Sequence, residues 1–455
     1  MKAILTCLPI LLFSFTSAQG QWTTTFLSQS KAQMGVTLHG SKVYFGGGNA
    51  TTGLSNLVEI YDPVADVWET NTLSISRAFP TAVAVGDKVF FAGGINWNNL
   101  QEYAIVDIFD TLTQTWSVAN LSTPGFYLQS ASYQNTALFA GFYDLVSFSP
   151  LSFTFSNVVN IYDAVSGNWS IDTLSQARGN FSATVVGDIA LFAGGQTSPT
   201  AMSDRVDIYN FSTGMWSTAS LSVARGFTAA VTVGNKAIFA GGTTSDNIQS
   251  DMVDIYDNDT GEWSTANLSF PRSFTTRGAA ACGKAFFAGG GKLNMPTFGF
   301  VNASNVVDIY DTGSGTWSAD TLSRSVINHS VTAAQNHVLV AGGLLFTQPL
   351  SLTNLVEIYT CEESSTSHEQ GAANLEIKVF PNPAENYVQL LAEDAESSVF
   401  QVNIFDMNGR LIKTLIMQNG TAFISIDDLS NGGYIVKVFN EVQITVKRLI
   451  KSDNQ

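Results

Sequence analysis

A pattern that recurs at nearly constant spacing constrains the fold of this chain more than any other feature. Six runs of the type Val-x-Ile-Tyr-Asp are each followed by a Trp ten residues after the Val, and an apolar run ends in Gly 25 or 26 residues after that Trp. The sets are Val58, Trp68 and Gly93; Val106, Trp116 and Gly141; Val159, Trp169 and Gly194; Val206, Trp216 and Gly241; Val253, Trp263 and Gly289; and Val307, Trp317 and Gly342. A period near 50 residues indicates a stack of equivalent supersecondary units.

The two ends of the chain each carry half of a further unit. A seventh run, Val356–Tyr359, has no Trp after it, whereas Trp22 has no such run before it and is followed by Gly47. Two complementary halves predict that the stack closes into a ring by pairing the strand of Trp22 with the strand of Val356. A ring of repeats also suits 455 residues, because a single compact core stops growing at about 250–300 residues.

Each unit is predicted to contain four short strands. β-branched and aromatic runs alternate with Gly, Asn and Asp turns, and no helical period separates them. The strand after each Trp segment is rich in small residues, as in Ala229-Ala230-Val231. Small side chains suit the innermost strand of a radial sheet, where the repeats crowd around one axis.

These residues resemble the kelch repeat, in which a double Gly ends the second strand, a Tyr lies in the third and a Trp in the fourth. The double Gly is present in six units, and only Gly141-Phe142 departs from it. The resemblance implies an all-β fold: a seven-bladed kelch-type β-propeller over residues 19–360, closed by its N- and C-terminal strands.

The N-terminus and the composition indicate an exported protein. Residues 1–18 have the pattern of a secretory signal peptide: Lys2, the apolar stretch Ile4–Phe15 and a small-residue cleavage site that ends at Ala18. That stretch is too short for a stable membrane anchor, and we expect no transmembrane segment after signal removal. The net charge of −16 argues against a nucleic-acid partner. Cys282 and Cys361 remain after signal removal, and we expect two free thiols rather than one disulfide.

The C-terminal region is predicted to be a second domain. Residues 361–374 have a polar linker composition, and residues 375–455 contain about seven strand-like runs, which predict a small antiparallel β-sandwich. The segments Val379–Ala384, Ile404–Arg410, Gly432–Val438 and Lys447–Ile450 resemble the C-terminal sorting domain of proteins exported by the bacterial type IX system. The resemblance implies a Bacteroidetes-type source, the type IX machinery as a partner of residues 375–455, and a secreted or surface-attached product. A carbohydrate-binding or immunoglobulin-like module is the less favoured alternative.

Loop lengths point to one face of the ring as the place for binding. Only the loops between the second and third strands vary in length, and variable loops on a rigid scaffold usually carry function. Several are aromatic, and the candidate binding residues in them are Trp97, Tyr143 and Phe298. The alternative is that these rings only cap the apolar blade edges.

A second set of candidates precedes the innermost strands on the same face. Arg77, Arg178, Arg225 and Arg272 recur at equivalent positions, and Phe79, Phe227 and Phe274 follow three of them by two residues. A partial ring of guanidinium groups at a channel mouth would hold carboxylates or acidic sugars. The favoured alternative is that each Arg bonds backbone carbonyls of its own blade, because a role that recurs in every unit is usually structural.

Few residues suggest catalysis. The four His residues lack metal-ligand spacing, so we predict no metal and no cofactor. The first hypothesis is an exported module that binds a protein or glycan through the loop face. The second is a small-sugar enzyme resembling the kelch sialic-acid mutarotases and acting at the channel mouth. The sequence favours the first hypothesis, that of a protein without enzymatic activity.

Overall fold

The computed structural model describes residues 21–148, 151–273, 278–294, 299–300, 302–347, 349–361, 377–392, 399–406, 411–418, 420–439 and 444–452. These ranges contain strands and turns and no helix, so none of them offers a helix that could cross a membrane. Two compact units, Met1–Glu363 and Ser364–Gln455, divide the chain. The predicted signal peptide lies outside the described residues, as does the predicted linker after Cys361.

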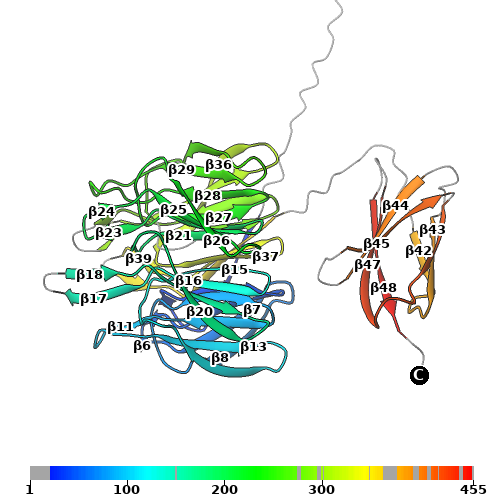
Figure 1. Ribbon diagram of the computed structural model, residues 1–455, viewed down its shortest axis with the longest axis horizontal. Coiled ribbons are helices and arrows are strands. Elements are labelled where there is room, and N and C mark those ends of the chain that lie inside the picture. The colour runs from blue at the N-terminus through cyan, green and yellow to red at the C-terminus, as the bar shows by residue number, and fades with distance from the viewer. Residues whose placement is uncertain are drawn as a thin grey trace, which may run out of the picture. The chain divides into compact units, whose positions relative to one another are not determined.

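The first unit is a ring of antiparallel sheets of four main strands, each one blade of a propeller, which Figure 1 shows from the side. Blade 1 consists of β3 (Gly35–His39), β4 (Lys42–Gly46), β7 (Leu57–Asp62) and β8 (Val67–Thr72), and blade 2 of β9 (Thr81–Val85), β10 (Lys88–Ala92), β13 (Ile105–Asp110) and β14 (Thr115–Asn120). Blade 3 consists of β15 (Gln129–Tyr133), β16 (Thr136–Ala140), β19 (Val158–Asp163) and β20 (Asn168–Thr173), and blade 4 of β21 (Ser182–Val186), β22 (Ile189–Ala193), β25 (Arg205–Asn210) and β26 (Met215–Ser220). Blades 5 and 6 are β27 (Ala229–Val233), β28 (Lys236–Ala240), β29 (Met252–Asp257) and β30 (Trp263–Asn267); β31 (Ala279–Ala281), β32 (Lys284–Ala288), β35 (Ser304–Asp311) and β36 (Thr316–Ile327).

The seventh blade joins the two ends of the propeller, which confirms the predicted ring closure. It consists of β37 (Ser330–Ala334), β38 (His337–Ala341), β41 (Leu355–Thr360) and β1 (Gln21–Phe26). In the β1–β41 pair Trp22 lies opposite Tyr359, with ring centroids 5.2 Å apart. The indole of Trp22 also donates a hydrogen bond to Asp320 Oδ2 of blade 6 at 2.8 Å.

The core of the propeller lies between neighbouring blades. The second strand of each blade is almost fully buried, and the Trp of each outer strand packs against a Tyr or Phe of the third strand. Tyr61 and Trp68 show the arrangement, with stacked rings whose centroids are 4.4 Å apart. The double Gly is required by space as well as by conformation. At Gly94, where φ is +108°, a Cβ would lie 2.8 Å from the carbonyl oxygen of Ala78.

The loops between second and third strands form small hairpins on one face of the ring, here called the loop face. In Figure 1 the labels of β6, β11, β17, β18, β23 and β24 lie together on one side of the propeller. The hairpins are β5 (Asn49–Ala50) with β6 (Gly53–Leu54), β11 (Ile95–Asn96) with β12 (Gln101–Glu102), β17 (Tyr143–Phe148) with β18 (Leu151–Phe155), β23 (Gln196–Ser198) with β24 (Ala201–Met202), β33 (Leu293–Asn294) with β34 (Gly299–Phe300), and β39 (Leu344–Leu345) with β40 (Ser351–Leu352). The short strand β2 (Lys31–Ala32) pairs with β5.

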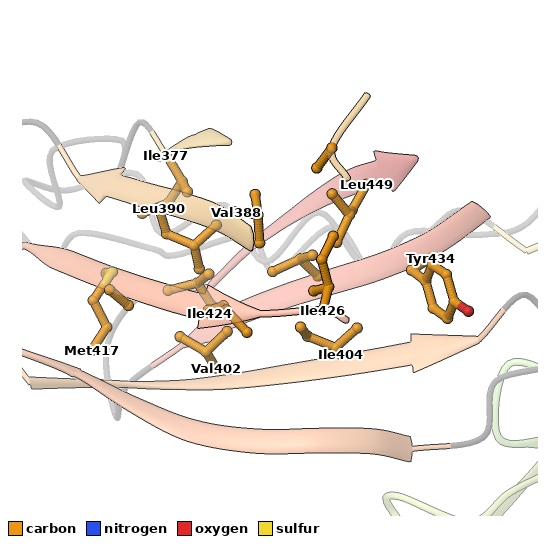
Figure 2. Packing of buried hydrophobic residues seen from close by; sticks show 14 of the residues in the cluster. Ile377, Val388, Leu390, Val402, Ile404, Met417, Ile424, Ile426, Tyr434 and Leu449 are labelled. Carbon is orange, nitrogen blue, oxygen red and sulfur yellow. The ribbon is translucent and has the colours of Figure 1, made fainter. Parts of the chain in front are cut away.

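The second unit is the predicted sandwich of seven strands. They are β42 (Ile377–Phe380), β43 (Tyr387–Ala392), β44 (Val399–Asp406), β45 (Leu411–Gln418), β46 (Thr421–Ser425), β47 (Gly432–Phe439) and β48 (Ile444–Lys451). The order β42-β43-β46 continues into β45-β44-β47-β48 through the single pair Gln418 and Thr421, so two sheets face each other. Figure 2 shows the apolar core between them, which includes Val388, Val402 and Ile404 without exposed surface.

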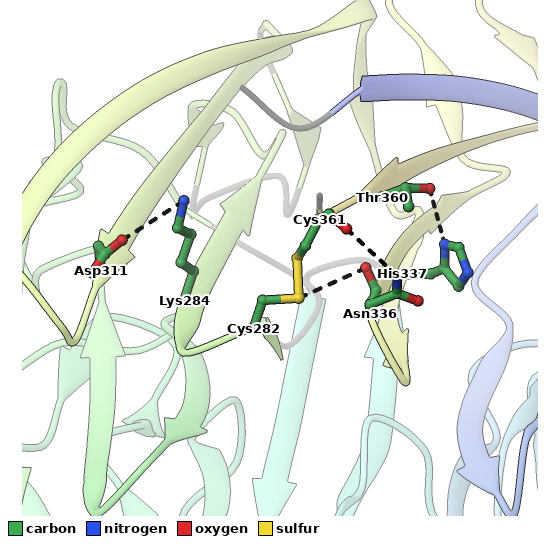
Figure 3. Close-up of a disulfide and its surroundings, with 7 residues drawn as sticks. All are labelled: Cys282, Lys284, Asp311, Asn336, His337, Thr360 and Cys361. Atoms are coloured by element: carbon green, nitrogen blue, oxygen red, sulfur yellow. Dashed lines mark hydrogen bonds and ion pairs between the residues drawn. A yellow bond between two sulfur atoms is a disulfide. The ribbon is translucent and has the colours of Figure 1, made fainter. Parts of the chain in front are cut away.

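The two cysteines form a disulfide, so the expectation of free thiols is wrong. Cys282 lies in the turn between β31 and β32, and Cys361 directly follows β41, with Cα atoms 6.4 Å apart (Figure 3). The turn of blade 7 joins the same cluster, because Asn336 accepts a hydrogen bond from the backbone N–H of Cys361 at 2.9 Å. The repeat itself places the two positions, 79 residues apart, on the same face of neighbouring units, so the disulfide is the alternative that the sequence left open.

Candidate functional site

The chain enters each innermost strand through a turn that places one residue at the mouth of the ring. This residue follows the recurrent Arg position by two and has a left-handed backbone in the six described units. The members are Gln33 (φ 62°), Phe79 (φ 55°), Tyr127 (φ 57°), Asn180 (φ 52°), Phe227 (φ 57°) and Asn328 (φ 53°), together called the mouth ring. A left-handed conformation is unfavourable for residues other than Gly, so the surrounding structure must impose it.

Backbone hydrogen bonds between neighbouring blades explain this conformation. Gln33 N–H donates to the carbonyl of Asn328 at 3.0 Å, and Phe79 N–H donates to the carbonyl of Gln33 at 2.9 Å. Phe227 N–H donates in the same way to Asn180 at 2.9 Å. The repeat therefore fixes the backbone of the mouth ring, while the side chains differ from blade to blade. A feature that differs between repeats is a better candidate for function than one that recurs.

Six aromatic residues gather beside the mouth ring on blades 2 and 3. The aromatic cluster consists of Phe79, Trp97, Phe126, Tyr127, Tyr143 and Phe155. The rings of Phe79 and Tyr127, from adjacent blades, have centroids 3.9 Å apart. Trp97 meets Phe126 at 5.3 Å and Tyr143 meets Phe155 at 5.0 Å, both edge to face. Aromatic contacts of this kind stabilise beyond the area that they bury.

Blade 3 accommodates this cluster because two positions of the repeat, the Arg and the second Gly, carry other residue types there. In blade 2 the second Gly, Gly94, lies against the side chain of Arg77. In blade 3 the Arg position is Gly125 and the second Gly position is Phe142, and a Cβ on Gly125 would lie 3.2 Å from the Phe142 side chain. The buried ring thus fills the space of the missing guanidinium. This exchange accounts for the irregularity of Gly141-Phe142 in the sequence.

The four recurrent arginines are not exposed at the mouth, so the predicted ring of ligand-binding guanidinium groups is wrong. Each has no exposed surface and forms an ion pair with a buried Asp of its own blade. The N···O distances are 2.8 Å for Arg77–Asp107, 2.5 Å for Arg178–Asp207, 2.6 Å for Arg225–Asp254 and 2.6 Å for Arg272–Asp308.

Backbone carbonyls accept the remaining hydrogen bonds of these arginines, as the structural alternative predicts. Arg178 Nε donates to the carbonyl of Gly194 at 2.8 Å, and its Nη2 donates to that of Phe192 at 2.8 Å. Arg225 makes the equivalent bonds. Lys31 replaces the Arg in blade 1 and pairs with Glu59 at 2.7 Å. In blades 1, 2, 4, 5 and 6 the recurrent cation therefore ties the first turn of the blade to its third strand, and in the Arg blades also to the second strand.

A cavity of about 500 Å³ runs along the axis inside the mouth ring. Its wall is formed by the innermost strands and carries hydroxyl groups such as those of Ser182 and Thr228, which share a hydrogen bond of 2.6 Å between blades. Phe79, Tyr127 and Phe227 of the mouth ring also line it. Among the described residues of the wall there is no Asp, Glu, Lys or Arg.

His329 is the one His in this wall, and it is uncharged at neutral pH. Its side chain is 2% exposed, and burial lowers its pKa to about 4. Its Nε2 lies 3.1 Å from the carbonyl oxygen of Ala288, which can only accept, so Nε2 carries the proton. Burial also raises the pKa of Tyr127 and of Tyr143, so both phenols are neutral too. The described wall is thus polar without charge.

The predicted aromatic candidates have different outcomes. Phe79, Trp97 and Tyr143 come together in the aromatic cluster, and Phe227 lines the cavity from blade 5. Phe274 and Phe298 lie outside the described residues. Sequence reasoning missed Phe126, Tyr127 and His329. An alignment of the seven repeat units places Tyr127 two residues after the Arg position. Blade 3 has Gly125 at that position, so a search for the Arg alone does not find Tyr127.

The described residues contain no group of three or more His, Cys, Asp or Glu that could hold a metal ion. The Asp residues that begin the turns before each Trp have a local role. Asp62 Oδ1 accepts hydrogen bonds from the backbone N–H groups of Val64 at 3.0 Å and Ala65 at 3.2 Å. Such Asx turns stabilise the connection between third and fourth strands.

Comparison with known proteins agrees with both parts of this architecture. Residues 76–120, which cover blade 2, match the Kelch motif, and residues 378–452 match the secretion system C-terminal sorting domain. Among solved structures, one titled "Structure of YjhT" is 18% identical, with a TM-score of 0.49 over 64% of this chain and 97% of that chain. No curated protein gave a significant match.

The fold and the two family-model matches define a class, that of exported β-propellers. More particularly, the chain combines a propeller, one blade of which matches the Kelch motif, with a second unit that matches the C-terminal sorting domain. The sorting domain implies an interaction with the type IX secretion machinery and export to the cell surface or the exterior.

Proposed function

We propose that this protein is an exported binding module that engages a glycan or protein with the aromatic side of its mouth. The observation that carries the proposal is the aromatic cluster around Phe79 and Tyr127, which breaks the symmetry of an otherwise regular ring. Phe79, Trp97, Tyr127 and Phe155 are partly exposed. Aromatic rings that are held rigidly and partly exposed are typical of binding sites.

The alternative of a small-sugar enzyme receives less support. It relied on arginines and polar groups at the mouth, and the arginines are paired with Asp in the interior. The remaining groups of the described wall are hydroxyls, amides and a neutral His. These groups suit recognition of a ligand better than proton transfer at neutral pH.

The proposed route to the exterior has two steps. The predicted signal peptide directs the chain across the inner membrane, and the sorting domain directs its passage through the outer membrane. The propeller then acts as a secreted or surface-attached module. Binding outside the cell agrees with a disulfide in the propeller, because disulfides persist in oxidising compartments.

The test is a thermal-shift screen of the full-length protein against extracellular polysaccharides and proteins. A ligand at about 100 times its Kd adds about 2.7 kcal/mol to the free energy of unfolding, which raises Tm. We expect the shift to vanish in the double variant Phe79→Asn/Tyr127→Asn. Asn suits the left-handed backbone, as Asn180 and Asn328 show at the equivalent positions.

The control is Leu112→Asn, which changes a 74% exposed side chain in a turn between β13 and β14, at the opposite ends of the strands from the loop face. This variant should keep the full shift. A shift that persists in the double variant would place the binding site away from the aromatic cluster and would overturn the proposal.

A further inference from the structure

We propose that the ligand of the mouth is an uncharged glycan, whose sugar rings stack on Phe79 and Tyr127 and whose hydroxyl groups donate to His329. This inference rests on the proposed binding function and adds the chemical class of the ligand. Three independent features of the site lead to it: its charge, its aromatic surface and its unpartnered hydrogen-bond acceptors.

The first feature is the absence of charge from the described wall of the cavity. Every recurrent Arg of the described blades is neutralised by its Asp behind the wall, and His329 is neutral. An anionic ligand would lose its hydration on entering and would find no opposite charge among the described residues of the wall. Such desolvation costs far more than that of a neutral hydroxyl group, so the site selects against acidic sugars.

The second feature is the aromatic surface at the mouth. Phe79 and Tyr127 come from adjacent blades and present two neighbouring rings to the cavity. The C–H groups on the face of a sugar ring are apolar, and the negative face of an aromatic ring attracts them. Phe227, on blade 5, provides a third ring in the same wall. Several rings around one opening fit a chain of sugars better than a single small molecule.

The third feature is an acceptor that has no partner. His329 carries its proton on Nε2, which donates to Ala288, so its Nδ1 is an acceptor. This Nδ1 is buried and makes no hydrogen bond within the described residues. Gln33 Oε1, in the mouth ring, is a second buried acceptor without a partner there. Buried acceptors require donors, which sugar hydroxyls supply and carboxylates do not.

Asn180 contributes an oriented amide to the same wall. Its Nδ2 donates to Gln196 Oε1 at 3.0 Å, and that oxygen also accepts from the hydroxyl of Tyr143 at 3.2 Å. Because Gln196 is fully buried, this network fixes the Asn180 side chain before any ligand arrives. A fixed amide beside aromatic rings reduces the entropy lost on binding.

The experiment uses pairs of oligosaccharides that differ by one acidic sugar. The full-length protein is screened on an array of neutral and acidic glycans and then titrated calorimetrically with matched pairs, such as lacto-N-tetraose with its sialylated form and xylohexaose with its glucuronic-acid-substituted form. We expect neutral glycans to bind, and the acidic member of a bound pair to bind about tenfold more weakly or worse. An acidic member that binds equally or more tightly overturns the inference, as does an array without any neutral ligand.

Variants connect the binding to the named residues. The double variant Phe79→Asn/Tyr127→Asn should lower the affinity for the neutral glycan by about tenfold or more. His329→Leu removes the unpartnered acceptor and should weaken it by about fivefold to tenfold. Leu112→Asn should leave the affinity unchanged. Unchanged near-ultraviolet circular dichroism shows that each variant is folded, and Phe227→Asn provides a second ring deletion if the double variant does not fold.

The outcomes separate this inference from the proposed function. One outcome is an array without any neutral ligand, together with a protein ligand whose binding depends on Phe79 and Tyr127. This outcome overturns the inference of a glycan ligand but agrees with the proposed binding function. If every ligand found binds the double variant as tightly as the parent protein, both the glycan inference and the proposed binding function are overturned. Neutral-glycan binding that is lost in the double variant but unchanged in His329→Leu removes the His from the site and contradicts the acceptor argument.

Discussion

At the scale of single residues, the most informative contacts are the buried ion pairs of the blades. Each Arg is matched by an Asp in the third strand of its blade, and blade 3 lacks both charges. It has Gly125 at the Arg position and Asn160 at the Asp position, where Asn160 Oδ1 still accepts from Ser122 N–H at 2.8 Å. In blades 1 to 6 the two charges are therefore kept or lost together, whereas blade 7 has Val326 at the Arg position and keeps Glu357 at the Asp position, where it accepts from Ser323 N–H at 2.7 Å. An unpaired buried charge would be far more costly than either combination.

Replacing one member of such a pair should destabilise the propeller strongly. Arg225→Met leaves the carboxylate of Asp254, which is 2% exposed, without its cation. We expect the free energy of unfolding to fall by about 3 to 5 kcal/mol in chemical denaturation. The double variant Arg225→Met/Asp254→Asn, which imitates the neutral state of blade 3, should recover most of this loss. Equal losses in the two variants would contradict the electrostatic explanation.

His329 should make the stability of the propeller depend on pH. Its pKa is about 4 in the folded protein and about 6.5 when unfolded, because burial disfavours the charged ring. Between these values the unfolded chain binds more protons, so stability is complete above pH 6.5 and falls as the pH decreases to 4. The difference between pH 7 and pH 4.5 should be about 2.5 kcal/mol for this group. In His329→Leu the decrease measured by chemical denaturation should be smaller by that amount, and an unchanged decrease would show that His329 is accessible to protons in the folded state.

At the scale of elements, the sequence predicted the blades well and the site only partly. Spacing, Gly pairs and the split unit at the termini define seven sheets without tertiary information. The role of Arg77 could not be read in this way, because its partner Asp107 lies in the third strand and is brought close only by the folded blade. Tyr127 was missed for a related reason: the residue that marks its position is Gly125 in this blade.

The closing strand β1 should contribute more to the stability of the propeller than its six residues suggest. Trp22 packs on Tyr359 within blade 7 and donates to Asp320 of blade 6, so its loss weakens two blades. We expect Trp22→Ala to lower the free energy of unfolding by about 3 kcal/mol, seen as a lower Tm. Trp22→Phe keeps the ring contact and removes only the hydrogen bond, and should cost about 1 kcal/mol. A Tm that is equal in both variants would mean that the contact with Asp320 dominates.

At the scale of the whole molecule, the chain combines a closed ring with a separate sorting domain. The ring requires its two ends to meet, and the disulfide between Cys282 and Cys361 adds a covalent bond at this closure. The sandwich has its own apolar core and shares none of the nine buried clusters with the propeller. Each unit thus has the means to fold around its own interior.

Removing the disulfide should lower the stability of the propeller without changing its fold. The bond closes a loop between residues 79 positions apart, so we expect Cys282→Ser/Cys361→Ser to lose about 2 to 5 kcal/mol in the free energy of unfolding. The measurement is chemical denaturation of the variant beside the oxidised and the reduced parent protein. The reduced parent should resemble the variant. A variant as stable as the oxidised parent would show that the strand pairing of blade 7 is sufficient for closure.

The position of the disulfide also determines how the propeller bears a mechanical load. Cys361 is the last described residue before the chain continues toward the sorting domain. A pull on that end reaches Cys361 first, and the covalent bond carries the force directly to the turn between β31 and β32 in blade 6. The hydrogen bonds that join β41 to β1 and β38 lie behind this bond and bear little of the tension. Tension applied at the C-terminal end of the propeller is therefore borne by the disulfide, and β41 stays paired with β1 and β38.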